Sequence, residues 1–182
     1  YQTVYARKSG AGAAPTAGLH FTEGTLNALE RAGHRTAYVT LHVGPGTFRP
    51  VQVETLDDHE THEEAYEVPE ATVAAIGEAR EQRRSVVAVG TTVVRTLESS
   101  VDATGNPAAG FGRTRLFIRP PHRFHVVDHL VTNFHLPRST LLALVMAFAG
   151  VDLTRRGYRE AVERRYRFYS YGDAMLIRGG RR

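Results

Sequence analysis

The spacing of apolar residues along the chain changes between a helical and an extended period several times. Leu26 and Leu29 stand at helical spacing after Thr22, which suits an N-cap, and Gly33 suits the residue that ends a helix. From residue 36 to 43 apolar and polar side chains alternate, which predicts a strand that leads into Gly-Pro-Gly at residues 44–46.

Strands and helices continue to alternate through the rest of the chain. Over 54–65 we predict an acidic loop or short helix, then a helix opened by Pro69, a short buried strand over 85–89 that ends at Gly90, and a helix from Thr92. A glycine-rich loop or hairpin over 102–113 and strands over 116–118 and 124–131 come next. The last elements are a buried helix capped by Ser139 or Thr140 and ending at Ala149, a helix capped by Thr154, and an extended segment over 173–177. This alternation predicts an α/β fold with at least some parallel strand pairing.

Composition narrows the class of protein. The 182 residues are 42% hydrophobic and 23% charged and include no cysteine, which indicates a soluble folded domain without disulfides or thiolate metal sites, and suits a cytoplasmic protein. The longest apolar run, residues 141–150, is shorter than the roughly twenty residues that span a bilayer.

Arginine supplies nearly all of the positive charge in a chain of formal net charge +4, and Lys8 is the sole lysine. Guanidinium groups match phosphate and stack on bases, so this bias slightly favours a nucleic-acid partner. High genomic GC content explains the same bias equally well. Arg178, Arg181 and Arg182 form a basic tail, expected to be disordered.

Five short stretches place polar, glycine or histidine residues at the end of an apolar run, where a fold presents chemistry to a ligand. They are AAPTAGLHF at 13–21, TLHVGPGTF at 40–48, VGTTVVRTLES at 89–99, TNFHLPRSTLL at 132–142 and YRFYSYGDAMLI at 166–177.

The third and fourth stretches suggest seats for polar ligand groups. Free amides and hydroxyls at Thr91 and Thr92 suit an anion or a ribose, although a simple capped turn is the alternative. Asn133 and His135 share one face of a strand end and suit a base edge or a ribose hydroxyl; a structural role for both is about equally favoured.

The other stretches suggest proton transfer and aromatic contacts. His20 and His42 stand beside small residues, so each can move a proton near a closely approaching ligand, although a lone histidine is more often structural. Tyr171 stands among aromatic residues that suit a sulfonium or a base, and Asp173 suits a donor edge; core packing is the alternative for the aromatic residues.

Nine histidines call for a test of metal binding. The sequence His59-Glu60-Thr61-His62 lacks the His-Glu-x-x-His spacing of a zinc-protease helix. His122, His125 and His129 do not share one face if their segment is a strand. We therefore expect no metal.

Read together, the five stretches resemble the S-adenosylmethionine:tRNA ribosyltransferase-isomerases of queuosine biosynthesis. PTAGLHF, TNFHLP and SYGDAMLI carry the resemblance, which extends from Tyr1 to about Ile177. It implies a transferase and isomerase for tRNA modification: the ribosyl part of S-adenosylmethionine, a co-substrate, is moved onto 7-aminomethyl-7-deazaguanine in the tRNA anticodon loop. Epoxyqueuosine-tRNA forms, and adenine and methionine leave.

The resemblance also implies an architecture. The family has a larger α/β, barrel-like domain with a mixed sheet and surrounding helices, and a smaller β-barrel domain. Residues 1–177 then form the catalytic α/β domain, residues 178–182 the basic tail, and the family's N-terminal segment is missing. Because residue 1 is tyrosine, the chain is expected to begin inside a longer protein. Separately, we expect the protein to be a monomer.

Within this interpretation, roles are assigned by chemistry. The catalytic candidates are His20, His42 and His135 for proton transfer, with Glu98 and Asp173 for the base edge or the amine. The substrate-binding candidates are Thr16, Gly18, Gly44, Gly46, Thr91, Thr92, Arg95, Asn133, Arg138, Ser170 and Tyr171. Two other classes stay open: a non-catalytic RNA-binding domain, and an enzyme that uses S-adenosylmethionine or a nucleoside without RNA.

Overall fold

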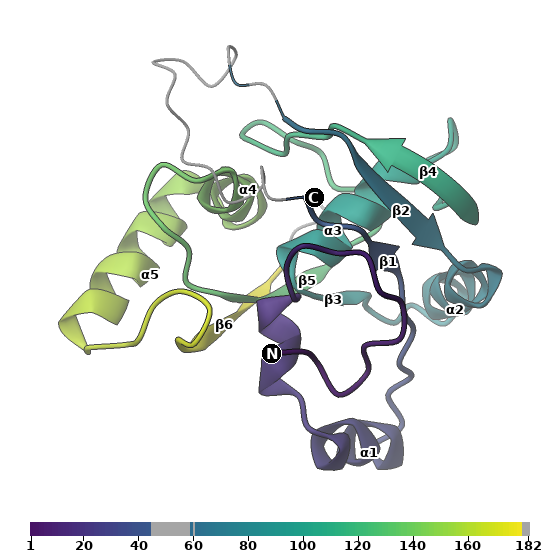
Figure 1. The fold of residues 1–182 in the computed structure, drawn as a ribbon, viewed down its shortest axis with the longest axis horizontal. Helices are drawn as coiled ribbons and strands as arrows, with labels where there is room; N and C mark the ends of the chain where they lie inside the picture. Colours follow the sequence, from purple (N-terminus) through teal and green to yellow (C-terminus); the bar gives the residue numbers. More distant parts are fainter. Residues whose placement is uncertain (45–58, 60, 180–182) are drawn as a thin grey trace.

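A computed structural model describes residues 1–44, 59 and 61–179, which form a mixed α/β fold with two small sheets (Figure 1). In chain order the elements are the 3₁₀ helix η1 (Thr16–His20), α1 (Glu23–Arg31), β1 (Thr40–Leu41), β2 (Glu64–Val68), α2 (Glu70–Glu81), β3 (Val87–Val89), α3 (Thr91–Ser99), β4 (Gly110–Thr114), β5 (His129–Asn133), α4 (Thr140–Ala149), α5 (Val151–Glu163) and β6 (Ala174–Arg178).

The two sheets differ in strand direction. One has the order β1-β2-β4 and is antiparallel throughout. The other has the order β3-β5-β6, in which β3 and β5 are parallel and β6 is antiparallel to β5. The parallel pair confirms the predicted α/β arrangement. Within the described residues neither sheet closes, so the barrel is not seen in this part of the chain.

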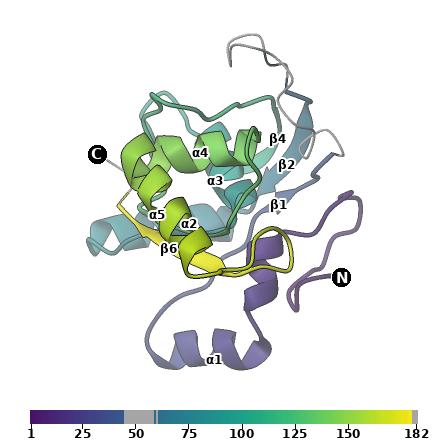
Figure 2. The same cartoon turned by 90° about the vertical axis from the view of Figure 1, so that its left-hand side faces the viewer.

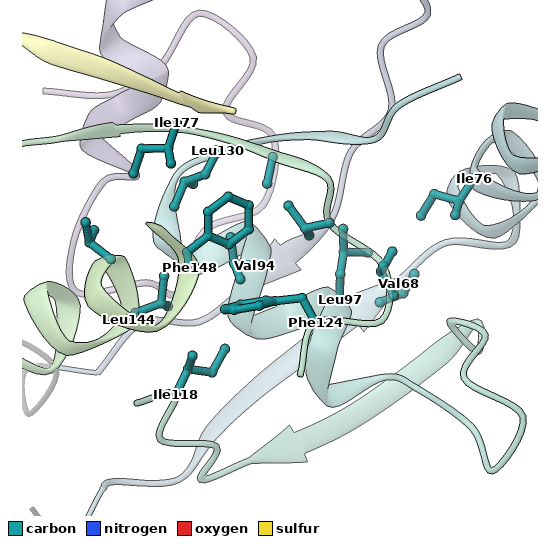
Figure 3. Close-up of a cluster of buried hydrophobic side chains, with 14 residues drawn as sticks. Val68, Ile76, Val94, Leu97, Ile118, Phe124, Leu130, Leu144, Phe148 and Ile177 are labelled. Atoms are coloured by element: carbon teal, nitrogen blue, oxygen red, sulfur yellow. The ribbon is translucent and has the colours of Figure 1, made fainter. Parts of the chain in front are cut away.

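The hydrophobic core joins the two sheets through α3, which contacts strands of both. Val94 and Leu97 of α3 are buried there, as the helical spacing predicts. The rings of Phe124 and Phe148 meet edge to face, with centroids 4.8 Å apart, in the middle of this core (Figure 3). Each such fully buried side chain contributes about 1.5–3 kcal/mol, so this core fixes how the two sheets pack.

Helices α4 and α5 lie next to each other at one end of the molecule (Figures 1 and 2). The Ser139 hydroxyl accepts a hydrogen bond from the backbone N–H of Leu142 at 3.1 Å, which confirms the predicted N-cap of α4. Gly150 has φ +87° and separates the two helices, so α5 begins at Val151. The prediction that Thr154 caps this helix was wrong, since Thr154 lies inside its first turn.

Helix α1 begins after Thr22, whose hydroxyl accepts from the N–H of Thr25, and α2 begins after Pro69, both as predicted. Helix α1 has no buried residue and projects from the rest of the fold (Figure 2).

Several strand predictions were wrong in position. Of residues 36–43 only Thr40–Leu41 pair, and residues 116–118 lie outside every strand. Strand β5 begins at His129, five residues after the predicted start at 124. Strand β2 was not predicted, because charged residues interrupt its apolar pattern. Arg178 closes β6 rather than opening a tail, and residues 180–182 lie outside the described part.

Candidate functional site

The last residue of β5 meets the last residue of η1. Asn133 is 2% exposed, and its Nδ2 lies 3.3 Å from Nε2 of His20, which is exposed. The same Nδ2 donates to the backbone carbonyl of Tyr169 at 3.0 Å. One amide group therefore joins stretches 13–21, 132–142 and 166–177 at the carboxyl end of β5.

The turn between α5 and β6 lies next to the contact between Asn133 and His20. The N–H of Tyr169 donates to the carbonyl of Phe134 at 3.0 Å, and the N–H of Gly172 donates to the carbonyl of Tyr169 at 3.0 Å. A Cβ on Gly172 would lie 2.3 Å from the carbonyl oxygen of Arg167, so this tight turn requires glycine.

Asp173 ends this turn as an ionised carboxylate. Its Oδ2 accepts from the backbone N–H of Arg167 at 2.7 Å, and its Oδ1 accepts from the Arg167 guanidinium at 3.3 Å. The backbone hydrogen bond and then the guanidinium hydrogen bond of Arg167 lower the pKa of Asp173, and an electrostatic interaction with His20 adds a smaller contribution in the same direction. Asp173 and His20 are thus electrostatic neighbours. Arg167, which positions the carboxylate, was not among the predicted residues.

The turn from β3 into α3 lies on the other side of η1. The N–H of Gly90 donates to the carbonyl of Val131 at 2.8 Å, and Gly90 has φ +102°. A Cβ built on Gly90 would lie 3.8 Å from Cβ of Ala17 and 3.3 Å from Oγ1 of Thr92. Stretch 89–99 therefore adjoins stretch 13–21, and four of the five stretches meet at the carboxyl ends of β3 and β5. Parallel α/β sheets commonly bind ligands at this edge.

His135 points into the protein rather than toward this cluster. Its Nε2 lies 2.8 Å from the Thr132 hydroxyl, and its backbone N–H donates to the Tyr158 hydroxyl at 2.9 Å. Burial lowers the pKa of His135 to about 4, and burial also raises the pKa of Tyr158 to about 12. A neutral, weakly basic imidazole with these contacts favours the structural alternative for His135.

Arg95 was a candidate for substrate binding and Glu98 for catalysis, but both side chains are buried. The Arg95 guanidinium pairs with the buried carboxylate of Glu64 and donates to the carbonyl of Leu116 at 3.3 Å. The Glu98 carboxylate accepts from three consecutive backbone N–H groups, those of His125, Val126 and Val127, at 2.8, 3.0 and 3.2 Å. These contacts favour a structural role for both side chains, because each holds partners within the fold.

The family model described as "Queuosine biosynthesis protein" matches residues 1–177. The chain belongs to the queuosine biosynthesis protein family. The resemblance carried by the five stretches is thereby confirmed.

Relatives in this family are similar over nearly the whole chain. The protein named "S-adenosylmethionine:tRNA ribosyltransferase-isomerase" from Thiobacillus denitrificans is 59% identical over 97% of this chain and 51% of its own length. The protein of the same name from Geobacter sulfurreducens is also 59% identical, over 97% of this chain and 52% of its own length.

A crystal structure of an S-adenosylmethionine tRNA ribosyltransferase from Thermotoga maritima is 50% identical, with a TM-score of 0.71 over 88% of this chain and 51% of that one. The chain thus spans about half the length of the relatives it matches.

In this member of the queuosine biosynthesis protein family, the described part of the second stretch, residues 40–44, begins in the other sheet, where Thr40–Leu41 form β1. A Cβ on Gly10 would lie 3.0 Å from Nδ1 of His42, and the N–H of Gly44 donates to Glu64 at 2.9 Å. Within the described part of the chain, neither His42 nor Gly44 is hydrogen-bonded to His20 or Asn133. Gly46 lies outside the described residues.

The remaining predicted residues lie near the cluster or on exposed surface. Gly18 is held by packing, since a Cβ there would lie 1.9 Å from Oη of Tyr5. The ring of Tyr171 is 81% exposed and lies 5.2 Å from the ring of Tyr1. Thr16 begins η1, Ser170 belongs to the turn that closes over Asn133, and Arg138 is exposed with φ +55°.

Hollows on the surface of the described residues occur elsewhere. One, of about 30 Å³, adjoins Arg95 and Leu144, and another, of about 510 Å³, is open and adjoins Arg80 and Arg83. Neither is lined by His20 or Asn133. Among residues 1–44, 59 and 61–179, no three histidine or acidic side chains gather as metal ligands do. No helix in that part is long and apolar enough to cross a membrane.

Proposed function

We propose that the chain is part of an S-adenosylmethionine:tRNA ribosyltransferase-isomerase. The observation that carries this proposal is the similarity to proteins of that name, 59% identical over 97% of the chain. The meeting of four signature stretches at one sheet edge supports it, because residues distant in sequence gather there around a histidine, a carboxylate and an amide.

The proposed reaction uses the two good leaving groups of S-adenosylmethionine. The amine of 7-aminomethyl-7-deazaguanine in tRNA attacks the ribose carbon that bears the sulfonium, and methionine leaves with the electron pair of that bond. Proton removal and ring rearrangement then release adenine and give epoxyqueuosine. Such a path needs proton transfer at the amine and at the departing base.

We assign these tasks to the cluster at the carboxyl ends of β3 and β5. His20 and Asp173 are titratable groups there, and hydrogen bonds from Arg167 lower the pKa of Asp173, which is a carboxylate at neutral pH. Thr91, Thr92 and Ser170 offer hydroxyls to the ribose. The exposed ring of Tyr171 offers a face to the sulfonium or a base. Arg95 and Glu98 support the site through the fold rather than by contact with substrate.

Exposed arginines on α5 and in the loops beside the cluster suit the tRNA backbone. Arg155, Arg156 and Arg159 lie on α5, Arg165 follows it, and Arg138 precedes α4. All five are exposed, and none has an ion pair with another described residue. Unpaired guanidinium groups attract phosphate and release counterions on binding. A tRNA substrate also fits a cytoplasmic location.

The decisive experiment measures adenine release from S-adenosylmethionine by the intact protein, with and without tRNA that carries the aminomethyl precursor. We expect saturable release only with that tRNA, and the same rate after treatment with a chelator. Salt-sensitive tRNA binding without adenine release would support the RNA-binding alternative. Nucleoside binding without tRNA affinity would support a small-molecule enzyme.

A further inference from the structure

The side-chain amide of Asn133 has only one orientation that fits its surroundings. Its neighbour at 3.0 Å is the backbone carbonyl of Tyr169, which can only accept a hydrogen bond. The group facing that carbonyl must therefore be the NH₂ of Asn133. The opposite orientation would place two oxygens against each other in a buried position.

The same NH₂ group lies 3.3 Å from Nε2 of His20. Because an amide nitrogen donates and does not accept, Nε2 must accept and cannot carry a hydrogen. In a neutral imidazole the hydrogen then resides on Nδ1. We propose that Asn133 is a positioning residue that holds His20 in the Nδ1–H tautomer.

The arrangement leaves an acceptor of Asn133 unused. Among the described residues, Oδ1 of Asn133 has no hydrogen-bond partner although it is buried. A buried acceptor without a partner is unfavourable. The two hydrogen bonds donated by Nδ2 outweigh this cost and therefore determine how the side chain is placed. Asn133 is in turn fixed by β5, where it pairs with Ala174 of β6.

This inference rests on the proposed function in one respect, namely what His20 does to a ligand. Nε2 is directed toward the buried Asn133, so Nδ1 is the nitrogen left for a bound molecule, and it carries a hydrogen. His20 therefore meets its ligand as a hydrogen-bond donor, which suits a ribose oxygen or an adenine ring nitrogen. A resting-state base at this position would need the other tautomer.

Nitrogen NMR of the intact protein labelled with ¹⁵N-histidine tests the tautomer directly. The His20 signals are assigned by their loss in His20→Gln. At pH 8 we expect the wild-type Nδ1 to resonate as a protonated ring nitrogen and Nε2 as an unprotonated one. Free histidine in water prefers the opposite tautomer, so the expected pattern is distinctive.

Variants at Asn133 test the cause. In Asn133→Ala the donor is lost, and His20 is expected to shift toward the Nε2–H tautomer. Asn133→Asp has nearly the same shape but presents an acceptor, so the same shift is expected there. Asn27→Ala, an exposed asparagine on α1, is the control and should leave the His20 signals unchanged. A wild-type His20 that is mainly Nε2–H overturns the proposal without any variant, as does an unchanged spectrum in both Asn133 variants.

Adenine release adds a readout for positioning. We expect Asn133→Ala to slow release by about tenfold or more, within the range of general acid–base effects. If Asn133 acts through His20, the double variant with His20→Gln should be no more than about twofold slower than His20→Gln alone. Fully multiplicative losses would contradict positioning. A wild-type protein that releases no adenine would refute the proposed function, whereas the tautomer is decided by the spectra alone.

Discussion

The largely buried imidazole of His135 should make the protein sensitive to mild acid. Burial lowers its pKa to about 4 from an ordinary value of 6.5, so between these values the unfolded chain binds more protons than the folded one. The free energy of unfolding should therefore fall as the pH drops from 6.5 toward 4. From this residue we expect a loss of about 2 kcal/mol at pH 5 relative to pH 7.

Urea unfolding at pH 5, 6 and 7 measures this loss, with His135→Gln as the comparison. The variant is less stable at neutral pH, but it should show a flatter pH dependence than the wild type. Parallel pH profiles for the two proteins would contradict the assignment of the acid sensitivity to His135.

Glu98 gives a second prediction at this scale. Its carboxylate accepts from three backbone N–H groups, so Glu98→Gln, which replaces one acceptor oxygen with an NH₂, should lower the free energy of unfolding by about 3 kcal/mol. At a temperature where the variant stays folded, adenine release by the intact protein should remain within about threefold of wild type, because the carboxylate supports the segment 125–127 rather than a substrate. A large loss of turnover with unchanged stability would restore the catalytic role expected from the sequence.

The sequence predicted residue types better than residue roles. Arg95 and Glu98 stand three apart on α3, which on an isolated helix is a polar face. In the fold their partners are Glu64, the carbonyl of Leu116 and the backbone of residues 125–127, all more than twenty positions away. Helical spacing contains no information on such partners. His20 and Asn133 are 113 positions apart and were grouped only through the family resemblance.

At the scale of elements, two glycines with opposite surroundings test how the turn over Asn133 is built. A Cβ on Gly172 would collide with the backbone of Arg167 and Phe168, whereas a Cβ on Gly157, inside α5, would meet nothing within 4 Å. Gly172→Ala should displace the turn and separate Tyr169 from Asn133, with a loss of stability and of adenine release. Gly157→Ala should stabilise the protein by about 1 kcal/mol, since alanine is the better helix former.

Thermal unfolding and adenine release, measured on both glycine variants, check this pair. If Gly172→Ala and Gly157→Ala change the stability by the same amount and in the same direction, the turn tolerates a side chain at residue 172. The contrast is useful because both substitutions add a single methyl group.

Helices were predicted well and strands poorly, for physical reasons. Helix boundaries depend on local capping, so Thr22, Pro69 and Ser139 located three of them from the sequence. Strand boundaries depend on partners. Residues 116–118 and 124–127, apolar except for His125, are partly or fully buried, yet they pair with no strand. In contrast, β2 pairs along its whole length with β4 despite two glutamates.

For the whole molecule, the sequence predicted the α/β class more securely than the sheet order. Four of the stretches meet because the parallel pair β3 and β5 brings their carboxyl ends together. The remaining stretch, residues 40–48, begins in the separate sheet of β1, β2 and β4, where its Thr40–Leu41 form β1. Long-range hydrogen bonds decide which strands share a sheet. The division into two open sheets therefore could not be predicted from the spacing of apolar residues along the chain.

The exposed arginines of α5 make the last prediction, on how the molecule meets tRNA. Arg155 and Arg159 are four positions apart on one helix face, where like charges repel by about 0.2–0.5 kcal/mol. A tRNA phosphate bound between the two guanidinium groups would attract both of them and offset their mutual repulsion. Replacing both with alanine should weaken tRNA binding and make the slope of log affinity against log salt shallower by about 1.5, since two phosphate contacts are lost. The double variant Arg35→Ala, Arg113→Ala has the same change in net charge but removes arginines paired with Glu78 and Glu63. If the α5 face binds RNA, only the first variant changes the slope; if net charge alone attracts tRNA, the two variants behave alike.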